Sequence, residues 1–292
     1  MSEHKAGFVN IIGKPNAGKS TLMNHFLGEK ISIITPKAQT TRHRIMGILN
    51  SDDFQIVYSD TPGIIDPAYQ LQKNMMKFVE SSLEDADIVL FLVDIRDEPE
   101  TYNFLHKIKR LEMPVYLLLN KIDLVDSEKL LEQKEIWKKE VEANAYFEIS
   151  AKQGINTESL LQKIKDQLPE HPPYFSKDEF TDKPERFFVS EIIREKIFKL
   201  YKKEIPYSCE VIVDEFINEA KILHLSVSIL VERTSQRIIM IGKGGSMLKK
   251  VGIEARKDLE AFFGKQVFLQ TYVKVEKDWR KNKSKLERLG YN

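Results

Sequence analysis

The segment Gly13–Ser20 constrains this chain more than any other stretch of its sequence. It reads GKPNAGKS, fits the pattern G-x-x-x-x-G-K-[ST], and lies between an apolar run over Gly7–Ile12 and a predicted helix. Glycines let the backbone curl so that its N–H groups point at phosphate oxygens, and the N-terminus of the following helix adds a partial positive charge. The order of strand, loop and helix therefore predicts a phosphate-binding loop.

Two side chains of this loop have chemistry of their own. Lys19 is expected to contact the β- and γ-phosphates, and Ser20 is expected to bind Mg²⁺. The motif alone leaves ATP and GTP both open. A later element, Asp60–Gly63 (DTPG), ends the apolar run Phe54–Ser59, where a carboxylate can hold Mg²⁺ through water and the Gly63 N–H can sense a γ-phosphate. The expected phosphate-binding residues are Gly13, Lys14, Pro15, Asn16, Ala17, Gly18, Lys19, Ser20, Thr21, Asp60, Thr61, Pro62, Gly63 and Ile64.

Base selection is predicted from the motif NKID, which ends the apolar run Val115–Asn120. Asp123 can accept hydrogen bonds from guanine N1–H and the 2-amino group, whereas adenine lacks both donors. An unpaired buried carboxylate would cost on the order of 1–3 kcal/mol, so this position selects guanine. The stem of Lys121 can cover the base, and the Ala151 N–H of a later SAK tripeptide can reach guanine O6. The expected guanine-binding residues are Asn120, Lys121, Asp123, Ser150, Ala151 and Lys152.

Continuous apolar runs, each followed by a polar loop and a helical stretch, make up residues 1–168. Such runs suit strands that are buried on both faces of a parallel sheet. Strands that alternate with helices, such as Glu128–Val141 and Thr157–Leu168, predict a βαβ fold with helices on both faces. The run Arg44–Asn50 is expected to add one antiparallel edge strand. All the motifs lie at strand C-termini, where an open α/β sheet binds ligands.

These motifs resemble the Ras-like GTPase superfamily over residues 7–168, which implies an α/β P-loop NTPase fold with a mostly parallel sheet. In such proteins a switch loop supplies a Thr hydroxyl to Mg²⁺ when the γ-phosphate is present. The segment Lys37–His43 occupies that place. Thr40 or Thr41 fills the role, and we favour Thr41. The expected Mg²⁺ ligands are therefore Ser20, Thr41 and Asp60.

The residue after DTPG is Ile64, where many GTPases have a Gln that orients the attacking water. An aliphatic side chain cannot position a water, so the source of hydrolytic power stays open, and Arg42 and Arg44 are unassigned. Asn16 offers one possibility. The loop resembles that of GTPases of the Era and tRNA-modification group, in some of which an Asn here helps to hold K⁺ near the β/γ bridge. The alternative is that Asn16 only shapes the loop.

The pattern changes after residue 168. Residues 169–185 hold four prolines and many charges and lack periodicity, which is typical of a linker. We therefore predict a GTP-binding domain over residues 1–168, a linker over 169–185 and a second domain over 186–292. The elements expected in the second domain are helices over Arg186–Lys203 and Ser246–Phe263, strands over Ser208–Asn218, Ile222–Arg233 and Gln266–Val275, and a short strand over Arg237–Ile241.

The sequence GKGG at Gly242–Gly245 lies between that short strand and the next helix. A KH domain uses a GXXG loop to clamp a nucleic-acid backbone, and the order of elements matches an α+β KH domain of the prokaryotic type II. Bases would lie on an apolar groove beside Ile239–Ile241. Trp279 and Tyr272 are either core residues or residues that stack on bases, and we favour the core. The expected RNA-binding residues are Gly242, Lys243, Gly244, Gly245, Lys249 and Lys250, and further candidate phosphate contacts are Lys277, Arg280, Lys281, Lys283, Lys285 and Arg288.

The charge distribution supports a polyanionic partner for the C-terminal part. The whole chain has a formal net charge of +1. Residues 1–168 carry 21 Lys and Arg against 25 Asp and Glu, whereas residues from Lys243 onward carry 13 against 6. Such an asymmetry suggests that the C-terminal part meets nucleic acid, although a solvated Lys-rich surface has the same composition.

Taken in order, GKPNAGKS, QTTRH, DTPG, NKID, SAK and GKGG resemble the Era family of GTPases over nearly the whole chain. The resemblance implies a GTPase with Mg²⁺ that binds small-subunit (16S) ribosomal RNA near its 3′ end and assists assembly of the small subunit. It also implies peripheral contact with the inner membrane. Two alternatives are an RNA-binding module in which GTP is a structural ligand and hydrolysis is incidental, and a tRNA-modification-type GTPase.

The only cysteine, Cys209, excludes an intrachain disulfide and suits a reducing cytosol. The longest strongly apolar run, Ile88–Ile95, is far shorter than the roughly 20 residues of a membrane span. The N-terminal residues lack the apolar core of a signal peptide. We expect a cytoplasmic, monomeric protein whose membrane contact is at most peripheral.

Overall fold

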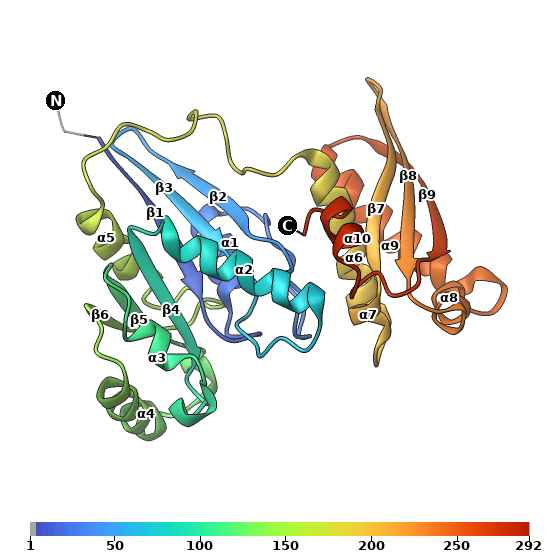
Figure 1. The fold of residues 1–292 in the computed structure, drawn as a ribbon. Helices are drawn as coiled ribbons and strands as arrows, with labels where there is room; N and C mark the ends of the chain where they lie inside the picture. The colour runs from blue at the N-terminus through green and yellow to red at the C-terminus, as the bar shows by residue number, and fades with distance from the viewer. Residues whose placement is uncertain (1–3, 292) are drawn as a thin grey trace. The chain divides into compact units, whose positions relative to one another are not determined.

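The computed structural model describes residues 4–291, which form two compact units (Figure 1). Unit 1 comprises the chain up to Pro67 together with Met75–Asp182. Unit 2 comprises Ala68–Asn74 together with the chain from Lys183 onward. Among the described residues, no helix is both long and apolar enough to cross a membrane.

Unit 1 is built on a six-stranded sheet with the order β2-β3-β1-β4-β5-β6. All neighbouring strands are parallel except β2 and β3, which are antiparallel, as predicted for the run that precedes Phe54. Every residue of the interior strands β4 and β5 is buried, which explains their continuous apolar sequences. The strands are β1 (Lys5–Ile12), β2 (Ile45–Asn50), β3 (Phe54–Asp60), β4 (Ile88–Asp94), β5 (Val115–Asn120) and β6 (Ala145–Ile149).

Helices cover both faces of this sheet, so the predicted fold class is confirmed. On one face, α2, α3 and α4 enclose a core that includes Phe91 and Trp137. On the other, α1 and α5 meet where His25 Nε2 lies 2.8 Å from Thr157 Oγ1. The helices are α1 (Lys19–Leu27), α2 (Gln70–Glu84), α3 (Leu105–Ile108), α4 (Ser127–Glu140) and α5 (Thr157–Gln167), with short 3₁₀ turns η1 (Pro99–Thr101) and η2 (Ile122–Leu124).

The first part of the predicted linker lies along the sheet of unit 1. The amide of Ala6 donates to the carbonyl of Pro169, and the Gln55 side chain accepts from the amides of Tyr174 and Phe175. Further on, the amide of Ile48 in β2 donates 2.9 Å to the carbonyl of Phe180. These residues lack regular secondary structure, but their backbone polar groups are engaged with unit 1.

Unit 2 contains a three-stranded sheet in the order β7-β8-β9, in which β7 and β8 are antiparallel and β8 and β9 are parallel. One face packs against α6 and α9, and residues such as Ile193, Val227 and Leu259 are fully buried there. The strands are β7 (Glu210–Asn218), β8 (Ile222–Val231) and β9 (Gln266–Val275), and the helices are α6 (Glu185–Leu200), α7 (Ile205–Ser208), α8 (Thr234–Ile241), η3 (Lys243–Gly245), α9 (Ser246–Phe263) and α10 (Lys283–Arg288).

The prediction of a strand over Arg237–Ile241 is wrong, because these residues form the second half of helix α8. The run of β-branched isoleucines favours a strand locally. However, the Gln236 side chain accepts from the amide of Arg233 at 3.0 Å and so satisfies a backbone N–H at the helix start. In the helix, Met240 is buried while Ile238 is 67% exposed. The cap and the burial of one face therefore override the strand propensity of these residues.

The two aromatic residues predicted for the core differ in outcome. Trp279 is fully buried and its Nε1 donates to the carbonyl of Ser208 at 3.1 Å, as expected of a core residue. Tyr272 is 49% exposed, so that prediction is wrong. Even-numbered residues of β9 point away from the helices because successive side chains of a strand alternate between its two faces.

Candidate functional site

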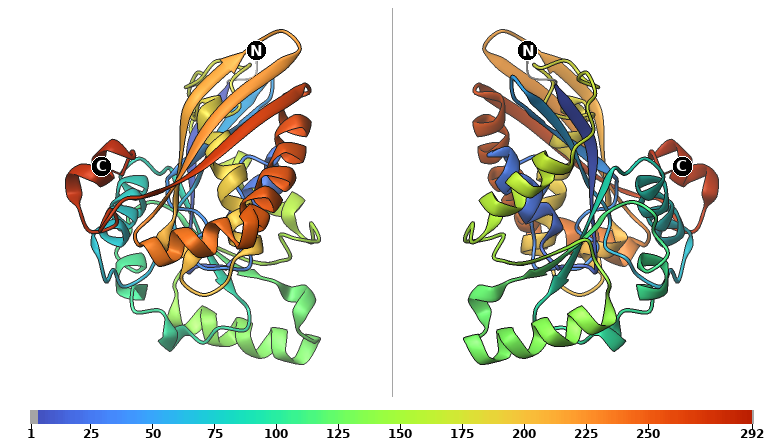
Figure 2. Two further views of the ribbon diagram at one scale, coloured as in Figure 1. Left: turned by 90° about the vertical axis from the view of Figure 1, so that its right-hand side faces the viewer. Right: turned by 90° about the vertical axis from the view of Figure 1, so that its left-hand side faces the viewer.

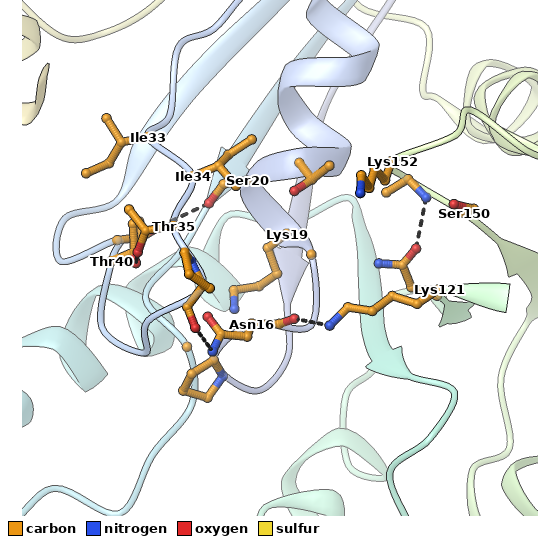
Figure 3. A pocket seen from close by; sticks show the side chains of 18 of the residues that line it. Asn16, Lys19, Ser20, Ile33, Ile34, Thr35, Thr40, Lys121, Ser150 and Lys152 are labelled. Carbon is orange, nitrogen blue, oxygen red and sulfur yellow. Dashed lines mark hydrogen bonds between the residues drawn. The ribbon is translucent and has the colours of Figure 1, made fainter. Parts of the chain in front are cut away.

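A pocket of about 730 Å³ in unit 1 collects most of the predicted nucleotide-binding residues at the carboxyl ends of the sheet strands (Figure 3). The predicted residues that line it are Pro15, Asn16, Gly18, Lys19, Ser20, Thr21, Thr41, Gly63, Asn120, Lys121, Asp123, Ser150, Ala151 and Lys152. Residues that line it without having been predicted are Ile33, Ile34, Thr35, Pro36, Gln39, Arg96 and Leu124, together with Thr40, the less favoured switch threonine.

Lys19 lies buried at the base of the phosphate loop. Its Nζ donates to the carbonyl oxygens of Gly13 at 3.2 Å and Lys14 at 2.9 Å, so the ammonium group is held beneath the curl of the loop. Burial lowers the pKa of Lys19 to about 8, and the charge of Asp60 opposes this shift. Gly18 has φ of 107°, and a Cβ there would lie 2.3 Å from Asn120 Nδ2, so only glycine fits.

The residues that were predicted to bind phosphate but do not line the pocket are Gly13, Lys14, Ala17, Asp60, Thr61, Pro62 and Ile64. Lys14 Nζ donates to Thr101 Oγ1 and lies 3.8 Å from the centre of the Tyr102 ring. Thr61 Oγ1 donates back into the sheet, to the carbonyl of Ile11 at 2.9 Å. The side chains of Lys14 and Thr61 therefore support the loop and the strand end rather than face the pocket.

Three oxygen-bearing side chains come together beside the loop. Ser20 Oγ lies 2.6 Å from Asp60 Oδ2 and 3.1 Å from Thr41 Oγ1. Asp60 Oδ1 is buried without a hydrogen-bond partner among the described residues. Burial raises the pKa of Asp60, while Lys19 and the neighbouring hydroxyls oppose that rise. Hard oxygen ligands around a buried carboxylate fit Mg²⁺, which would neutralise phosphate charge when bound.

The same geometry distinguishes the two threonines of the switch loop. Thr40 Oγ1 donates to the carbonyl of Lys37 at 2.7 Å and lies 2.6 Å from Thr35 Oγ1. Its hydroxyl is thus occupied within the loop, whereas the Thr41 hydroxyl lies beside Ser20 and Asp60. This geometry favours Thr41 over Thr40 as the candidate Mg²⁺ ligand.

Gly63 and Ile64 sit against the phosphate loop. A Cβ on Gly63 would lie 2.5 Å from the backbone nitrogen of Pro15, so this close approach needs glycine. The amide of Ile64 donates to the carbonyl of Gly13 at 3.0 Å. The Ile64 side chain lines a separate hollow beside α2 and α3 and does not line the nucleotide pocket. It brings no polar atom to the γ-phosphate end of the site.

The base motif is hydrogen-bonded to the phosphate loop. Asn120 Nδ2 donates to the carbonyl of Ala17 at 2.7 Å, and Asn120 Oδ1 accepts from the amide of Ala151 at 2.9 Å. Ser150 Oγ donates to Asp123 Oδ1 at 2.6 Å, which leaves the other carboxylate oxygen to accept from a base. Asn120 therefore holds the backbone of Ala17 and Ala151 in position, and Ser150 holds the carboxylate of Asp123.

Asp94 and Arg96 belong to the same arrangement but were not predicted. Lys121 Nζ donates to the carbonyl of Asn16 at 2.6 Å and to Asp94 Oδ2 at 2.7 Å (Figure 3 shows the first of these). Arg96 binds both oxygens of the Asp94 carboxylate. Burial disfavours the ionised form of Asp94, but hydrogen bonds from Arg96 and Lys121 prevail and lower its pKa to about 2. The sequence signal that could have identified Asp94 is its position as an acidic residue at the end of β4, the strand beside β5.

In unit 2 the GKGG sequence forms a tight turn between α8 and α9. Gly242, Gly244 and Gly245 all have positive φ, at 73°, 59° and 78°. No heavy atom lies within 4 Å of a Cβ built on Gly244 or Gly245, so these two positions face open space. Lys249 and Lys250 follow on the first turns of α9 and are exposed. A loop of this kind between two helices lets a phosphate backbone approach closely.

Comparison with known proteins agrees with both sites. The family described as 50S ribosome-binding GTPase matches residues 8–121, and the KH domain family matches residues 204–280. An Era crystallised with MgGDPNP and nucleotides 1506–1542 of 16S ribosomal RNA is 39% identical, with 99% of each chain covered and a TM-score of 0.94. A single-residue variant of Aquifex aeolicus Era bound to GDP·AlF₄⁻ is 40% identical over 98% of this chain and 99% of that one, with a TM-score of 0.94.

This chain belongs to the Era family. Its two parts are therefore an Era-type GTPase domain and a KH domain, and the KH-type order of elements holds even though the segment before GKGG is a helix rather than a strand. Membership of the Era family also decides against a tRNA-modification-type GTPase, one of the alternatives that the sequence left open. As an Era-family GTPase, the chain hydrolyses GTP without a glutamine after DTPG.

Proposed function

We propose that this Era-family GTPase binds the 3′ region of 16S ribosomal RNA through its KH unit and assists assembly of the small ribosomal subunit. The observation that carries the proposal is the presence, in one chain, of a guanine-nucleotide pocket and a GKGG turn in which Lys243 and Gly244 are exposed, followed by the exposed Lys249 and Lys250. The Era that was crystallised with nucleotides 1506–1542 of 16S ribosomal RNA supports this choice of RNA.

The test is binding of a labelled RNA of that 3′-terminal sequence, with the protein loaded with either GDP or a non-hydrolysable GTP analogue. With the GTP analogue bound, we expect the protein to bind the native RNA more tightly than a scrambled RNA of equal length. Equal affinity for the native and scrambled RNAs in both nucleotide states would contradict the proposal. Crosslinking to small subunits in the same two states identifies the RNA nucleotides involved.

For the hydrolytic step, the residues of this chain position the nucleotide. Lys19 is placed to neutralise phosphate charge, and Ser20, Thr41 and Asp60 would hold Mg²⁺, which would supply further charge neutralisation when bound. Incidental hydrolysis at a structural nucleotide would show as turnover that ribosomal RNA and small subunits leave unchanged. We expect instead that small subunits alter turnover.

We further propose that K⁺ stimulates hydrolysis through Asn16. This residue has φ of 63° and lines the nucleotide pocket, and its Nδ2 donates to the carbonyl of Pro36 at 3.1 Å, so its amide group lies between the phosphate loop and the switch loop. Turnover is to be compared in KCl and NaCl at equal ionic strength, with Asn16→Ala as the control. Equal rates in the two salts for the unaltered protein would remove the proposal.

We also propose a cytoplasmic location, a monomeric state and, at most, peripheral contact with the membrane. The Lys-rich stretch after Lys243 supports such a contact, because basic segments are attracted to anionic lipid. Cell fractionation with a high-salt wash and sedimentation of the purified protein test these points. Retention on membranes after the wash, or a dimer mass at micromolar concentration, would count against them.

A further inference from the structure

The sheet of unit 2 has a second face, which points away from α6 and α9. Odd-numbered residues of β8 and β9 enter the core, so even-numbered residues form this outer face. Toward the β7–β8 turn it is open and carries large apolar side chains: Ile217 is 53% exposed and Phe268 is 49% exposed. Apolar residues gathered on one exposed face indicate a binding surface more often than scattered ones do.

The strand register places these side chains in one row. Ile217 of β7 lies opposite His224 of β8, and His224 lies opposite Phe268 of β9. The rings of His224 and Phe268 have centroids 5.6 Å apart. A hollow of about 220 Å³ lies over this row, and we call it the outer groove: its lining residues include Ile217, His224 and Phe268 together with Glu215 and Glu219.

The charges of the outer groove are acidic. Glu215 and Glu219 line it, and no lysine or arginine among the described residues does. Three nearby lysines lie outside the lining: Lys274 pairs with Asp214 at 3.6 Å, Lys265 donates to Asn218 Oδ1 at 2.7 Å, and Lys221 is exposed in the β7–β8 turn. Two carboxylates beside an apolar row attract a cationic side chain and repel a phosphate backbone.

The outer groove is also far from the GKGG turn along the strands. Strands β8 and β9 both run from the β7–β8 turn toward the end of the unit where α8 and the GKGG turn lie (Figures 1 and 2). The groove lies at the start of these strands and on the face opposite the helices. An RNA bound at the GKGG turn would therefore not cover the outer groove.

We propose that the outer groove binds a basic protein segment, in which an apolar side chain enters the row between Ile217 and Phe268 and flanking Lys or Arg side chains pair with Glu215 and Glu219. This rests on the proposed function in one respect: the segment is supplied by a protein of the small ribosomal subunit. The groove then provides a second, RNA-independent point of attachment to the same particle.

The main competing occupant is single-stranded RNA, since bases stack on exposed aromatic rings such as Phe268 and Tyr272. The carboxylates of Glu215 and Glu219 argue against it. Their charge also separates the two occupants experimentally, because reversing it to lysine weakens a contact with a basic segment and strengthens a contact with RNA.

The first experiment uses the full chain with Ile217→Ser and Phe268→Ser together. We expect binding to purified small subunits to weaken by about tenfold or more, which is typical when central apolar contacts are lost. Binding of protein-free 3′ RNA and of GDP should stay unchanged. Both side chains are about half exposed, so an unaltered melting temperature shows that the fold is retained. Wild-type affinity of this variant for small subunits overturns the proposal.

The second experiment uses Glu215→Lys with Glu219→Lys, and Glu132→Lys with Glu135→Lys on α4 as a control that makes the same change of charge at two exposed carboxylates of unit 1. We expect weaker binding to small subunits and no gain on protein-free RNA. Tighter binding to both would identify RNA as the occupant and overturn the proposal. If the unaltered chain does not bind the 3′ RNA but binds subunits through Ile217 and Phe268, the outer-groove proposal is supported and the proposed RNA function is wrong. If the chain binds neither the RNA nor the subunits, both proposals are wrong.

Discussion

At the scale of single residues, Asp123 is the side chain that we expect to select the base. Its Oδ1 accepts from Ser150, which leaves the other carboxylate oxygen as an acceptor for a base. Replacing Asp123 by Asn exchanges an acceptor for a donor, which should cost GTP binding on the order of 2–3 kcal/mol, or roughly 30- to 150-fold in Kd, while XTP binding improves. Fluorescence titration with both nucleotides measures this, with Glu132→Gln on α4 as the control. Retained GTP affinity would refute the role of Asp123.

Lys19 gives the site a pH dependence. Because its pKa is lowered to about 8 in the nucleotide-free protein, a growing share of Lys19 is neutral as the pH rises above 8. A phosphate ligand favours the charged form, so GTP affinity should fall with rising pH and binding should take up protons between about pH 8 and 10. Calorimetry in buffers of different ionisation enthalpy measures the uptake. Lys19→Arg, which stays charged, should lose the proton uptake.

The same linkage has the opposite sign for folding of the nucleotide-free chain. The unfolded state holds the Lys19 proton up to about pH 10.5, whereas the folded state begins to release it near pH 8. The unfolded state therefore binds more protons in this window, and the contribution of Lys19 to stability increases as the pH rises through it.

Residue identities were predicted better than residue roles. Asp123, Ser20 and Thr41 follow from spacing along the chain, because strand ends of a parallel sheet converge at one edge. Asp94 and Arg96 were missed because their importance depends on where the Lys121 ammonium lies, and that depends on contacts between two neighbouring strands. Lys14 was misplaced because sequence does not show that its side chain lies over the Tyr102 ring.

At the scale of elements, the turn between α8 and α9 carries the RNA-binding prediction. Gly244 has φ of 59° and faces open space, so Asp, which tolerates positive φ, fits there at a cost of about 1 kcal/mol. We expect Gly244→Asp to abolish binding of the 3′ RNA by placing a carboxylate against phosphate, with GDP affinity unchanged. Gly244→Asn is the isosteric control and should retain part of the binding. Unchanged RNA affinity of the Asp variant would contradict the KH assignment of this turn.

Elements with strong periodicity were predicted closely, since α9 and β9 have the bounds expected from sequence. The segment Arg237–Ile241 was not, because a helix cap supplied by Gln236 and tertiary burial of Met240 outweigh the local preference of isoleucine. Helix α2 was not singled out, since its sequence QLQKNMMKFVESSLE follows the irregular segment 64–69 without a clear cap.

At the scale of the whole molecule, the two units carry opposite net charge and are expected to respond differently to salt. For RNA binding by unit 2, the logarithm of the binding constant should fall linearly with the logarithm of the salt concentration, because phosphate contacts release counterions. Replacing Lys249 and Lys250 by Ala should reduce that slope by about 1.4 for a single strand and leave GDP binding unaltered. Filter binding at several KCl concentrations measures the slope. An unchanged slope would show that these lysines only face solvent.

The connection between the units has a further consequence, for colloidal behaviour. Strand β2 is an edge of the six-stranded sheet, and an edge strand presents unpaired backbone groups that can template pairing with another chain. Here Gly47 pairs with Thr181, Ile48 donates to Phe180, and Met46 donates to the carboxylate of Asp182. The connecting segment thus covers an edge prone to self-association. A protease that cut within it would create an aggregation hazard as well as separate two activities.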